Sequence, residues 1–246
     1  ITLISSLQQS TALCASLTST IKIILGSAYN QAVDLGADWK ELCVLAQKIY
    51  TLCPGCAAEV FKITQEAFKH VPYNAAMLLM RLVDSHYDKS YVFAKDIAHS
   101  LVIQDDLVLR SMGLQLFHEL VNAKQEDIYE LALKQAGVAM GYDAKNASSL
   151  FAALIETHQE FVLPVVYAQA GNIIEKIKQG LIKELFDAGR ILLVSMIKNK
   201  FEPARKMLID LFAQGKYKSI DELVDSCFEE LLLENNKIFF DLAEQA

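Results

Sequence analysis

Hydrophobic residues recur at alternating steps of three and four along most of this 246-residue chain. The first such stripe begins at Leu3, continues through Leu7, Cys14 and Ile21, and ends near Ala28. This spacing places the stripe along one face of an α-helix, because about 3.6 residues complete a helical turn. No segment keeps the strict alternation of apolar and polar residues that marks a half-buried β-strand. The pattern predicts an all-α chain.

Polar and turn-forming residues divide the chain into about 12 predicted helices, each of roughly 12 to 20 residues. The predicted helix starts share a short polar side chain that can accept a hydrogen bond from first-turn amides. They are Asp38, Asn74, the pair Asp105-Asp106, the pair Glu126-Asp127, the segment from Asp143 to Asn146, and Ser219. Ser219 and Glu222 also have the spacing of a capping box. Pro54 is expected in the first turn of a helix, where its missing N–H costs nothing.

Part of residues 116–137 is repeated 34 positions later. The matched pairs are Leu116/Leu150, Phe117/Phe151, Leu120/Leu154, Gln125/Gln159, Glu126/Glu160 and Gly137/Gly171. A period of this length corresponds to one pair of helices. Each predicted pair has a face too apolar to be exposed alone, and stacking the pairs side by side buries these faces.

In this repeat and in its helix lengths the chain resembles an α-solenoid of the HEAT or armadillo type. The resemblance covers roughly residues 38–232 and implies a right-handed array of stacked antiparallel helix pairs. We therefore expect one helical-repeat domain over residues 1–246. It has an N-terminal capping helix region at 1–37, repeats at 38–218 and an acidic C-terminal cap at 219–246. A compact helical domain without repeats is the alternative.

The composition favours long helices joined by short links. The chain has only 10 Gly and 4 Pro, whereas a β-rich chain of this length would need many more turn residues. Its hydrophobic fraction of 53% and mean hydropathy of +0.24 supply material for a continuous core.

Charge is distributed unevenly along the chain. The net charge of −7 argues against a general nucleic-acid binder, which needs clustered Lys and Arg. Residues 172–218 nevertheless hold ten basic and five acidic side chains, and residues 219–246 hold eight acidic and one basic. We define the basic strip as Lys176, Lys178, Lys183, Lys198, Lys200, Arg205 and Lys206. The strip is either a surface for an acidic partner or a set of ordinary solvated helix faces.

The predicted function is a non-enzymatic scaffold that binds a protein or peptide partner through the solenoid surface, with the basic strip contacting acidic groups. One alternative is nucleic-acid or anionic-membrane binding through the same strip. The other is an enzyme whose site lies in the concave groove. The chain contains no Gly-rich phosphate loop and no nucleophile elbow. We therefore expect no catalytic residues, no cofactor and no metal site.

Five cysteines occur, an odd number with irregular spacing. Free thiols are the expected state, which favours the cytoplasm or another reducing compartment. The segment Cys53-Pro54-Gly55-Cys56 precedes a predicted helix and is open to three interpretations: an interhelical turn, a redox pair or half of a zinc site. No apolar run is long enough to cross a bilayer, and no signal peptide is predicted.

Overall fold

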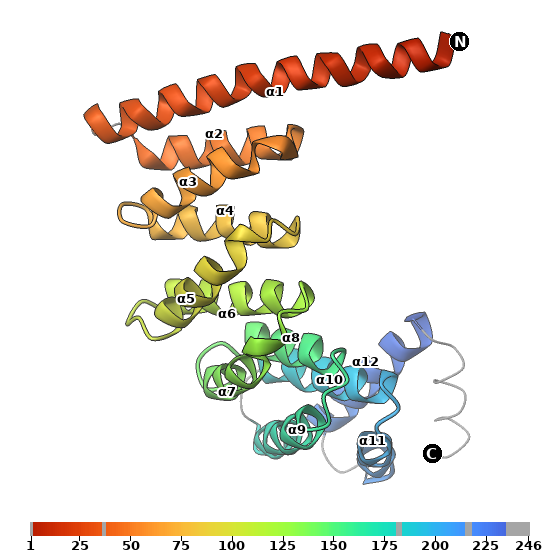
Figure 1. Cartoon of the computed structure of the whole chain (residues 1–246). Helices are drawn as coiled ribbons and strands as arrows, with labels where there is room; N and C mark the ends of the chain where they lie inside the picture. The colour runs from red at the N-terminus through yellow and green to blue at the C-terminus, as the bar shows by residue number, and fades with distance from the viewer. Residues whose placement is uncertain (1, 36–37, 181–183, 215–217, 235–246) are drawn as a thin grey trace. The chain divides into compact units, whose positions relative to one another are not determined.

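The computed structural model describes residues 2–35, 38–180, 184–214 and 218–234 (Figure 1). Within these residues the chain forms twelve α-helices, two short 3-10 helices and no β-strand, which confirms the all-α prediction. The chain divides into two compact units, Ile1–Leu101 and Val102–Ala246. Among the described residues, no helix combines the length and apolarity needed to cross a bilayer.

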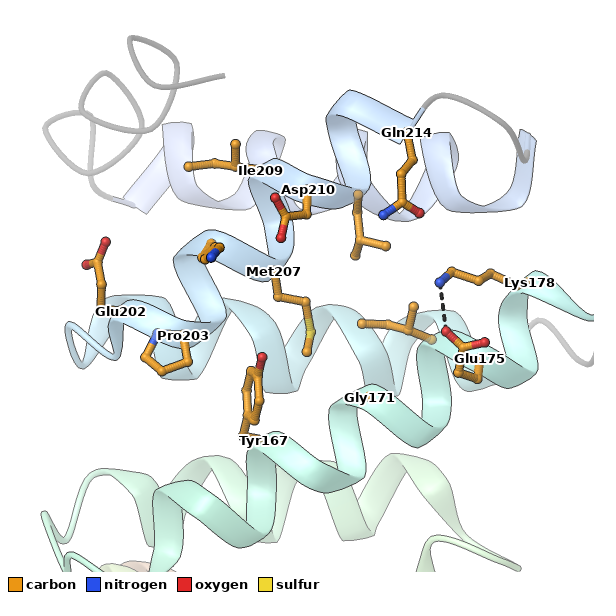
Figure 2. A pocket seen from close by; sticks show the side chains of 13 residues that line it. Tyr167, Gly171, Glu175, Lys178, Glu202, Pro203, Met207, Ile209, Asp210 and Gln214 are labelled. Atoms are coloured by element: carbon orange, nitrogen blue, oxygen red, sulfur yellow. Dashed lines mark hydrogen bonds and ion pairs between the residues drawn. The ribbon is translucent and has the colours of Figure 1, made fainter.

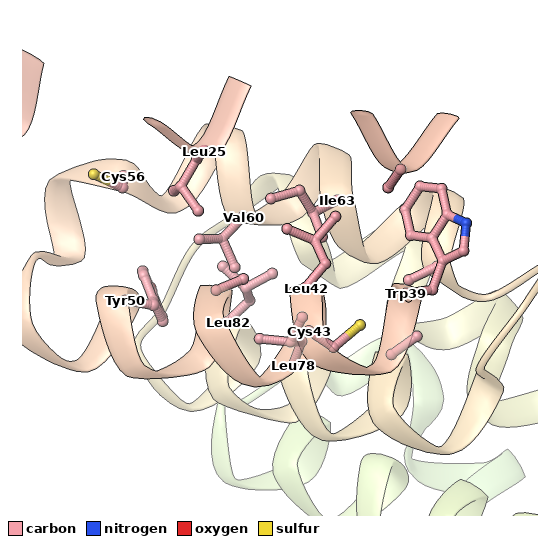
Figure 3. Packing of buried hydrophobic residues seen from close by; sticks show 14 residues of the cluster. Leu25, Trp39, Leu42, Cys43, Tyr50, Cys56, Val60, Ile63, Leu78 and Leu82 are labelled. Atoms are coloured by element: carbon pink, nitrogen blue, oxygen red, sulfur yellow. The ribbon is translucent and has the colours of Figure 1, made fainter. Parts of the chain in front are cut away.

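The first unit is built from helices packed on both sides of α2. Its elements are α1 (Thr2–Leu35), α2 (Trp39–Leu52), η1 (Pro54–Cys56), α3 (Ala57–Ala67), α4 (Pro72–Asp84) and α5 (Lys89–Val102), of which α5 ends at the unit boundary. α1 packs against α2, η1 and α3, while α2 packs against α3 and α4. Leu25, Leu42, Val60 and Leu82 come from four different helices and are at most 6% exposed (Figure 3). The four helices therefore share one core.

The second unit has two rows of helices. Its elements are α6 (Leu107–Asn122), η2 (Glu126–Ile128), α7 (Tyr129–Ala139), α8 (Ala144–Ile155), α9 (Val162–Lys178), α10 (Glu184–Lys198), α11 (Glu202–Gln214) and α12 (Lys218–Glu234). In one row α6, α8, α10 and α12 pack each against the next. In the other, α7, α9 and α11 each pack against the helix before and the helix after in the chain. Each helix pair is therefore covered by its neighbour.

The 34-residue repeat has a structural counterpart in this unit. Phe117 on α6 and Phe151 on α8 are both fully buried, and they are the two largest side chains in that state among the described residues. Leu120 and Leu154 are also fully buried. α6 and α8 pack directly against each other, so both copies of the repeat supply the same layer of the core. Extension of this arrangement into one solenoid over the whole chain stays a prediction.

The first helices of successive pairs begin at Trp39, Pro72, Leu107 and Ala144, at intervals of 33, 35 and 37 residues. Four of the helices that open a pair also end alike, whereas α2 is followed by Cys53 with φ −141°. α4, α6, α8 and α10 are followed by His86, Lys124, His158 and Lys200, whose φ angles are 58°, 57°, 58° and 60°.

This ending is a Schellman motif, in which one residue adopts the left-handed conformation after a helix. Each of the four left-handed residues donates its N–H to the carbonyl three positions earlier, at 2.9 to 3.1 Å. After α4, α6 and α10, the next N–H reaches the carbonyl five positions earlier, at 2.9 to 3.1 Å. Glycine normally occupies this position, and none of the four residues is glycine, so the sequence did not reveal the motif.

Three of the predicted N-caps are confirmed. The Asp38 carboxylate accepts from two first-turn amides at 2.8 and 3.3 Å, and that of Asp106 does so at 2.7 and 3.1 Å. Asp143 accepts from the Asn146 N–H at 3.2 Å. Pro54 begins η1, as expected.

Two predicted N-caps are wrong. α4 begins at Pro72, so Asn74 lies inside the helix. Proline at the first helical position has its φ fixed near the helical value and starts the helix earlier than Asn74 would. α12 already includes Lys218, and the Ser219 hydroxyl donates to the Ile177 carbonyl at 3.3 Å rather than capping its own helix. The predicted last helix, after Asn235-Asn236, lies outside the described residues.

Candidate interaction groove

The described members of the basic strip all belong to the second unit. Lys176 and Lys178 lie on α9, Lys198 ends α10, Lys200 is the left-handed residue before α11, and Arg205 and Lys206 lie on α11. Lys183 lies outside the described residues. The strip is therefore spread over two helices, one helix end and one turn.

Two lysines of the strip already have carboxylate partners. Lys178 Nζ lies 2.7 Å from Glu175 Oε1, one helical turn away on α9. Lys198 Nζ lies 3.9 Å from Glu230 Oε1 on α12. Burial lowers the pKa of Lys198, and the nearby Glu156 carboxylate opposes this effect. The Lys198 ammonium group thus links the end of α10 to α12.

The rest of the described strip differs in exposure. Lys176, Lys200 and Lys206 are exposed, and no ion pair joins them to another described residue. Arg205 is half-buried, and its Nε is buried without a hydrogen-bond partner in the described part of the chain. The exposed cations open to a partner are therefore Lys176, Lys200 and Lys206.

A groove of about 850 Å³ lies between α9 and α11 (Figure 2). Tyr167 and Ile174 line it from α9, and Met207 and Leu211 line it from α11. Ile174 and Leu211 are buried, whereas Met207 and Tyr167 are half-buried and point into the gap. The Tyr167 ring packs edge-on against Phe201, with ring centroids 5.6 Å apart. These four side chains form an apolar floor.

The charged lining of the groove is mixed. Glu202 lies toward one end, and the Glu175–Lys178 ion pair lies at the other (Figure 2). Glu202, Lys206 and Asp210 follow one another at four-residue steps on α11. Residues four apart are neighbours on one helix face, so this face presents a carboxylate, an ammonium group and a second carboxylate in a row.

Gly171 leaves space in the wall of the groove formed by α9. A Cβ atom added there would meet no atom within 4 Å. Its counterpart in the repeat, Gly137 on α7, does not line the groove, and a Cβ there would meet only the amide end of Gln169 at 3.9 Å. The same substitution at Gly171 would fill the groove and at Gly137 would leave it open, so the two positions form a matched pair for mutation.

Of the predicted site residues, the structure brings Lys178 and Lys206 into the groove and leaves Lys176, Lys198, Lys200 and Arg205 outside its lining. Sequence reasoning missed the apolar floor. The signal was present in the seven-residue spacing of Tyr167 and Ile174 and the four-residue spacing of Met207 and Leu211. Nothing local showed that α9 and α11 would face a common groove.

Among the described residues, no three His, Cys, Asp or Glu side chains are grouped closely enough to hold a metal ion. No protein-family model, curated protein or solved structure matches the chain. Any assignment of function therefore depends on the geometry of the chain itself.

Proposed function

We propose that this chain is a non-enzymatic protein-binding module of the α-solenoid type, which binds an amphipathic helix of a partner protein in the groove between α9 and α11. The observation that carries the proposal is an apolar floor, accessible at Tyr167 and Met207, between two charged helix faces. Such a groove receives the apolar stripe of a helix, because both partners present side chains at the same helical spacing.

The charges of α11 specify the partner further. Glu202, Lys206 and Asp210 complement a cation, a carboxylate and a second cation spaced four residues apart on the bound helix. Lys178 adds little attraction, since Glu175 already neutralises it. The groove thus favours a partner of alternating charge over the uniformly acidic partner expected from the basic strip.

The test is a selection from displayed helical peptides that carry a leucine stripe and have Lys or Glu at three flanking positions. We expect enrichment of peptides with Lys, Glu and Lys at four-residue steps. Gly171→Gln fills the groove with a helix-favouring residue and should weaken binding of the enriched peptide at least tenfold. Lys206→Glu should weaken it similarly by opposing the central carboxylate.

Gly137→Gln is the matched control, because it makes the same substitution at the equivalent position outside the groove. Binding should persist in this variant, and circular dichroism should show unchanged helicity in all three. If the enriched peptides bind the Gly171→Gln variant as tightly as they bind the parent chain, the peptide-binding site lies outside this groove. Binding of single-stranded RNA or phosphatidylserine vesicles that survives Gly171→Gln and falls steeply with salt would replace the proposal with an electrostatic one.

A further inference from the structure

The turn between α2 and α3 brings two thiols together. Cys53 is the C-cap residue that follows α2 and precedes η1, and Cys56 ends η1. The Cys56 thiol donates a hydrogen bond to Cys53 Sγ, with the two sulfur atoms 3.6 Å apart. Cys56 is fully buried, whereas Cys53 is half-buried and reachable from solvent. One sulfur is thus accessible and the other lies directly behind it.

α1 adds polar groups beside the accessible sulfur. Thr18 Oγ1 lies 3.3 Å from Cys53 Sγ. A Cβ added at Gly55 would lie 3.4 Å from Thr18 Cγ2, so α1 passes directly over this turn. Lys22, one turn further along α1, pairs with Glu59 of α3 at 3.4 Å. These contacts place a hydroxyl and an ammonium group near Cys53.

The two sulfur atoms consequently differ in acidity. Hydrogen bonds from Thr18 and Cys56 lower the pKa of Cys53 the most. The Gly55 amide and the Lys22 charge lower it further, and partial burial, which raises the pKa, is outweighed by the four together. Burial raises the pKa of Cys56 to about 11, and its bond to Cys53 and the Glu59 carboxylate add to this effect. Cys53 is the better nucleophile at neutral pH, since the thiolate is the reactive form.

The other described cysteines have no such arrangement. Cys43 and Cys227 are buried in the core, and burial raises their pKa to about 11 and about 12. Neither forms a disulfide with another described cysteine. Cys43 and Cys227 are therefore expected to be unreactive, and the reactivity of Cys53 can be compared with theirs in the same protein.

We propose that Cys53 and Cys56 form a reversible dithiol–disulfide pair, which exchanges with small-molecule disulfides such as oxidised glutathione. The Cys53 thiolate attacks one sulfur of the oxidant, forms a mixed disulfide and releases one glutathione thiolate, which takes up a proton. Cys56 then loses its proton and attacks Cys53 Sγ, and the second glutathione leaves as a thiol. Two protein thiols are oxidised to one disulfide, and one glutathione disulfide is reduced to two thiols.

The geometry needs only a local change to close this bond. The two sulfur atoms must approach from 3.6 Å to about 2.05 Å, which side-chain rotation within one turn can achieve.

The test begins with the full chain carrying Cys14→Ser, which removes the one cysteine outside the residues with described side chains. The protein is equilibrated with oxidised glutathione, quenched in acid, alkylated and digested with trypsin. Residues 49–62 form one tryptic peptide that contains both Cys53 and Cys56. We expect this peptide to lose two hydrogens and to resist alkylation until it is reduced.

Variants separate the two steps. Cys56→Ser should accumulate a glutathione mixed disulfide on Cys53, because the second attack is missing, and Cys53→Ser should leave Cys56 unmodified. In the reduced protein, iodoacetamide should modify Cys53 at least tenfold faster than Cys43 or Cys227. Thr18→Val should slow that reaction more at pH 7 than at pH 10, because loss of the Thr18 hydrogen bond raises the pKa of Cys53 and leaves less thiolate at the lower pH.

Two results would overturn the proposal. The first is a peptide 49–62 that stays fully reduced in excess oxidised glutathione. The second is a Cys53 that reacts with iodoacetamide no faster than the core thiols. Circular dichroism of each variant checks that helicity is retained, so that loss of folding is not mistaken for loss of exchange.

Discussion

Cys227 and Cys43 are thiols that the core holds in their neutral form. Cys227 is fully buried on α12 and Cys43 is 2% exposed on α2. Transfer of a thiolate into an apolar core is unfavourable, which is why burial raises the pKa of both. In the unfolded chain the same thiols ionise near their ordinary value of 9.0. The unfolded state therefore releases these protons at a lower pH than the folded state.

This difference predicts a loss of stability in alkali. The stabilising effect is complete below pH 9 and is lost as the pH rises toward 11 for Cys43 and toward 12 for Cys227. The free energy of unfolding, measured with guanidinium, should decrease from pH 8 to pH 10. This decrease should be smaller for Cys227→Ala than for the parent chain. Equal decreases in the two proteins would mean that Cys227 ionises without unfolding.

At the scale of elements, local signals and distant contacts had different predictive value. Asp38, Asp106 and Asp143 were found from the sequence because an aspartate cap satisfies amides only two or three residues away. Ser219 was misassigned because its hydroxyl bonds to the Ile177 carbonyl, 42 residues away. The pairing of Lys198 with Glu230 was hidden for the same reason, since it joins α10 to α12.

The left-handed helix endings carry a cost that glycine would remove. Lys124 has φ 57° and an exposed side chain, so its replacement loses no packing. A left-handed residue other than glycine costs about 1 to 2 kcal/mol, partly offset by the greater entropy of glycine in the unfolded chain. Lys124→Gly should therefore raise the free energy of unfolding by about 0.5 to 1 kcal/mol, measured by thermal denaturation.

Ala123→Gly is the neighbouring control for this substitution. Ala123 has φ −76°, a conformation that alanine adopts without strain. Glycine there should lower the stability by about 0.5 to 1 kcal/mol. If both variants are destabilised alike, the ending of α6 gains nothing from glycine and the left-handed residue carries no strain.

At the scale of the molecule, the sequence predicted helices and a repeat more readily than a site. The repeat was visible because Phe117 and Phe151 fill equivalent buried positions, which restricts both to large apolar residues. The groove could not be predicted from the sequence, because its two walls, α9 and α11, are far apart in the chain. Residues of the two walls are separated by 24 positions (Lys178 to Glu202) to 47 positions (Tyr167 to Gln214). Surface charges such as Lys206 are weakly constrained by packing, so their arrangement follows only from the fold.

The two compact units should unfold in separable steps. Trp39 is the only tryptophan, is 7% exposed in the first unit and stacks on His70 with ring centroids 4.9 Å apart. Its fluorescence reports that unit, while circular dichroism reports both. Phe151→Ala should cost about 3 to 5 kcal/mol in the second unit. In urea, the circular dichroism transition should move to lower concentration and the Trp39 transition should stay in place.

Val60→Ala is the counterpart in the first unit, where Val60 is fully buried. It should shift the Trp39 transition to lower urea concentration. A Phe151→Ala protein in which both signals shift together would show that the units unfold as one cooperative array, the behaviour expected if helix pairs stack continuously along the chain.

The four left-handed endings also bear on how repeats in this chain can be recognised. Their residues, His86, Lys124, His158 and Lys200, are all basic, and their φ angles agree within 3° because the left-handed region is narrow. A comparison of amino-acid letters aligns only the two copies that start near Leu116 and Leu150. A comparison of backbone torsion angles picks out four helix ends, so helix ends of this kind are easier to recognise in this chain from torsion angles than from residue types.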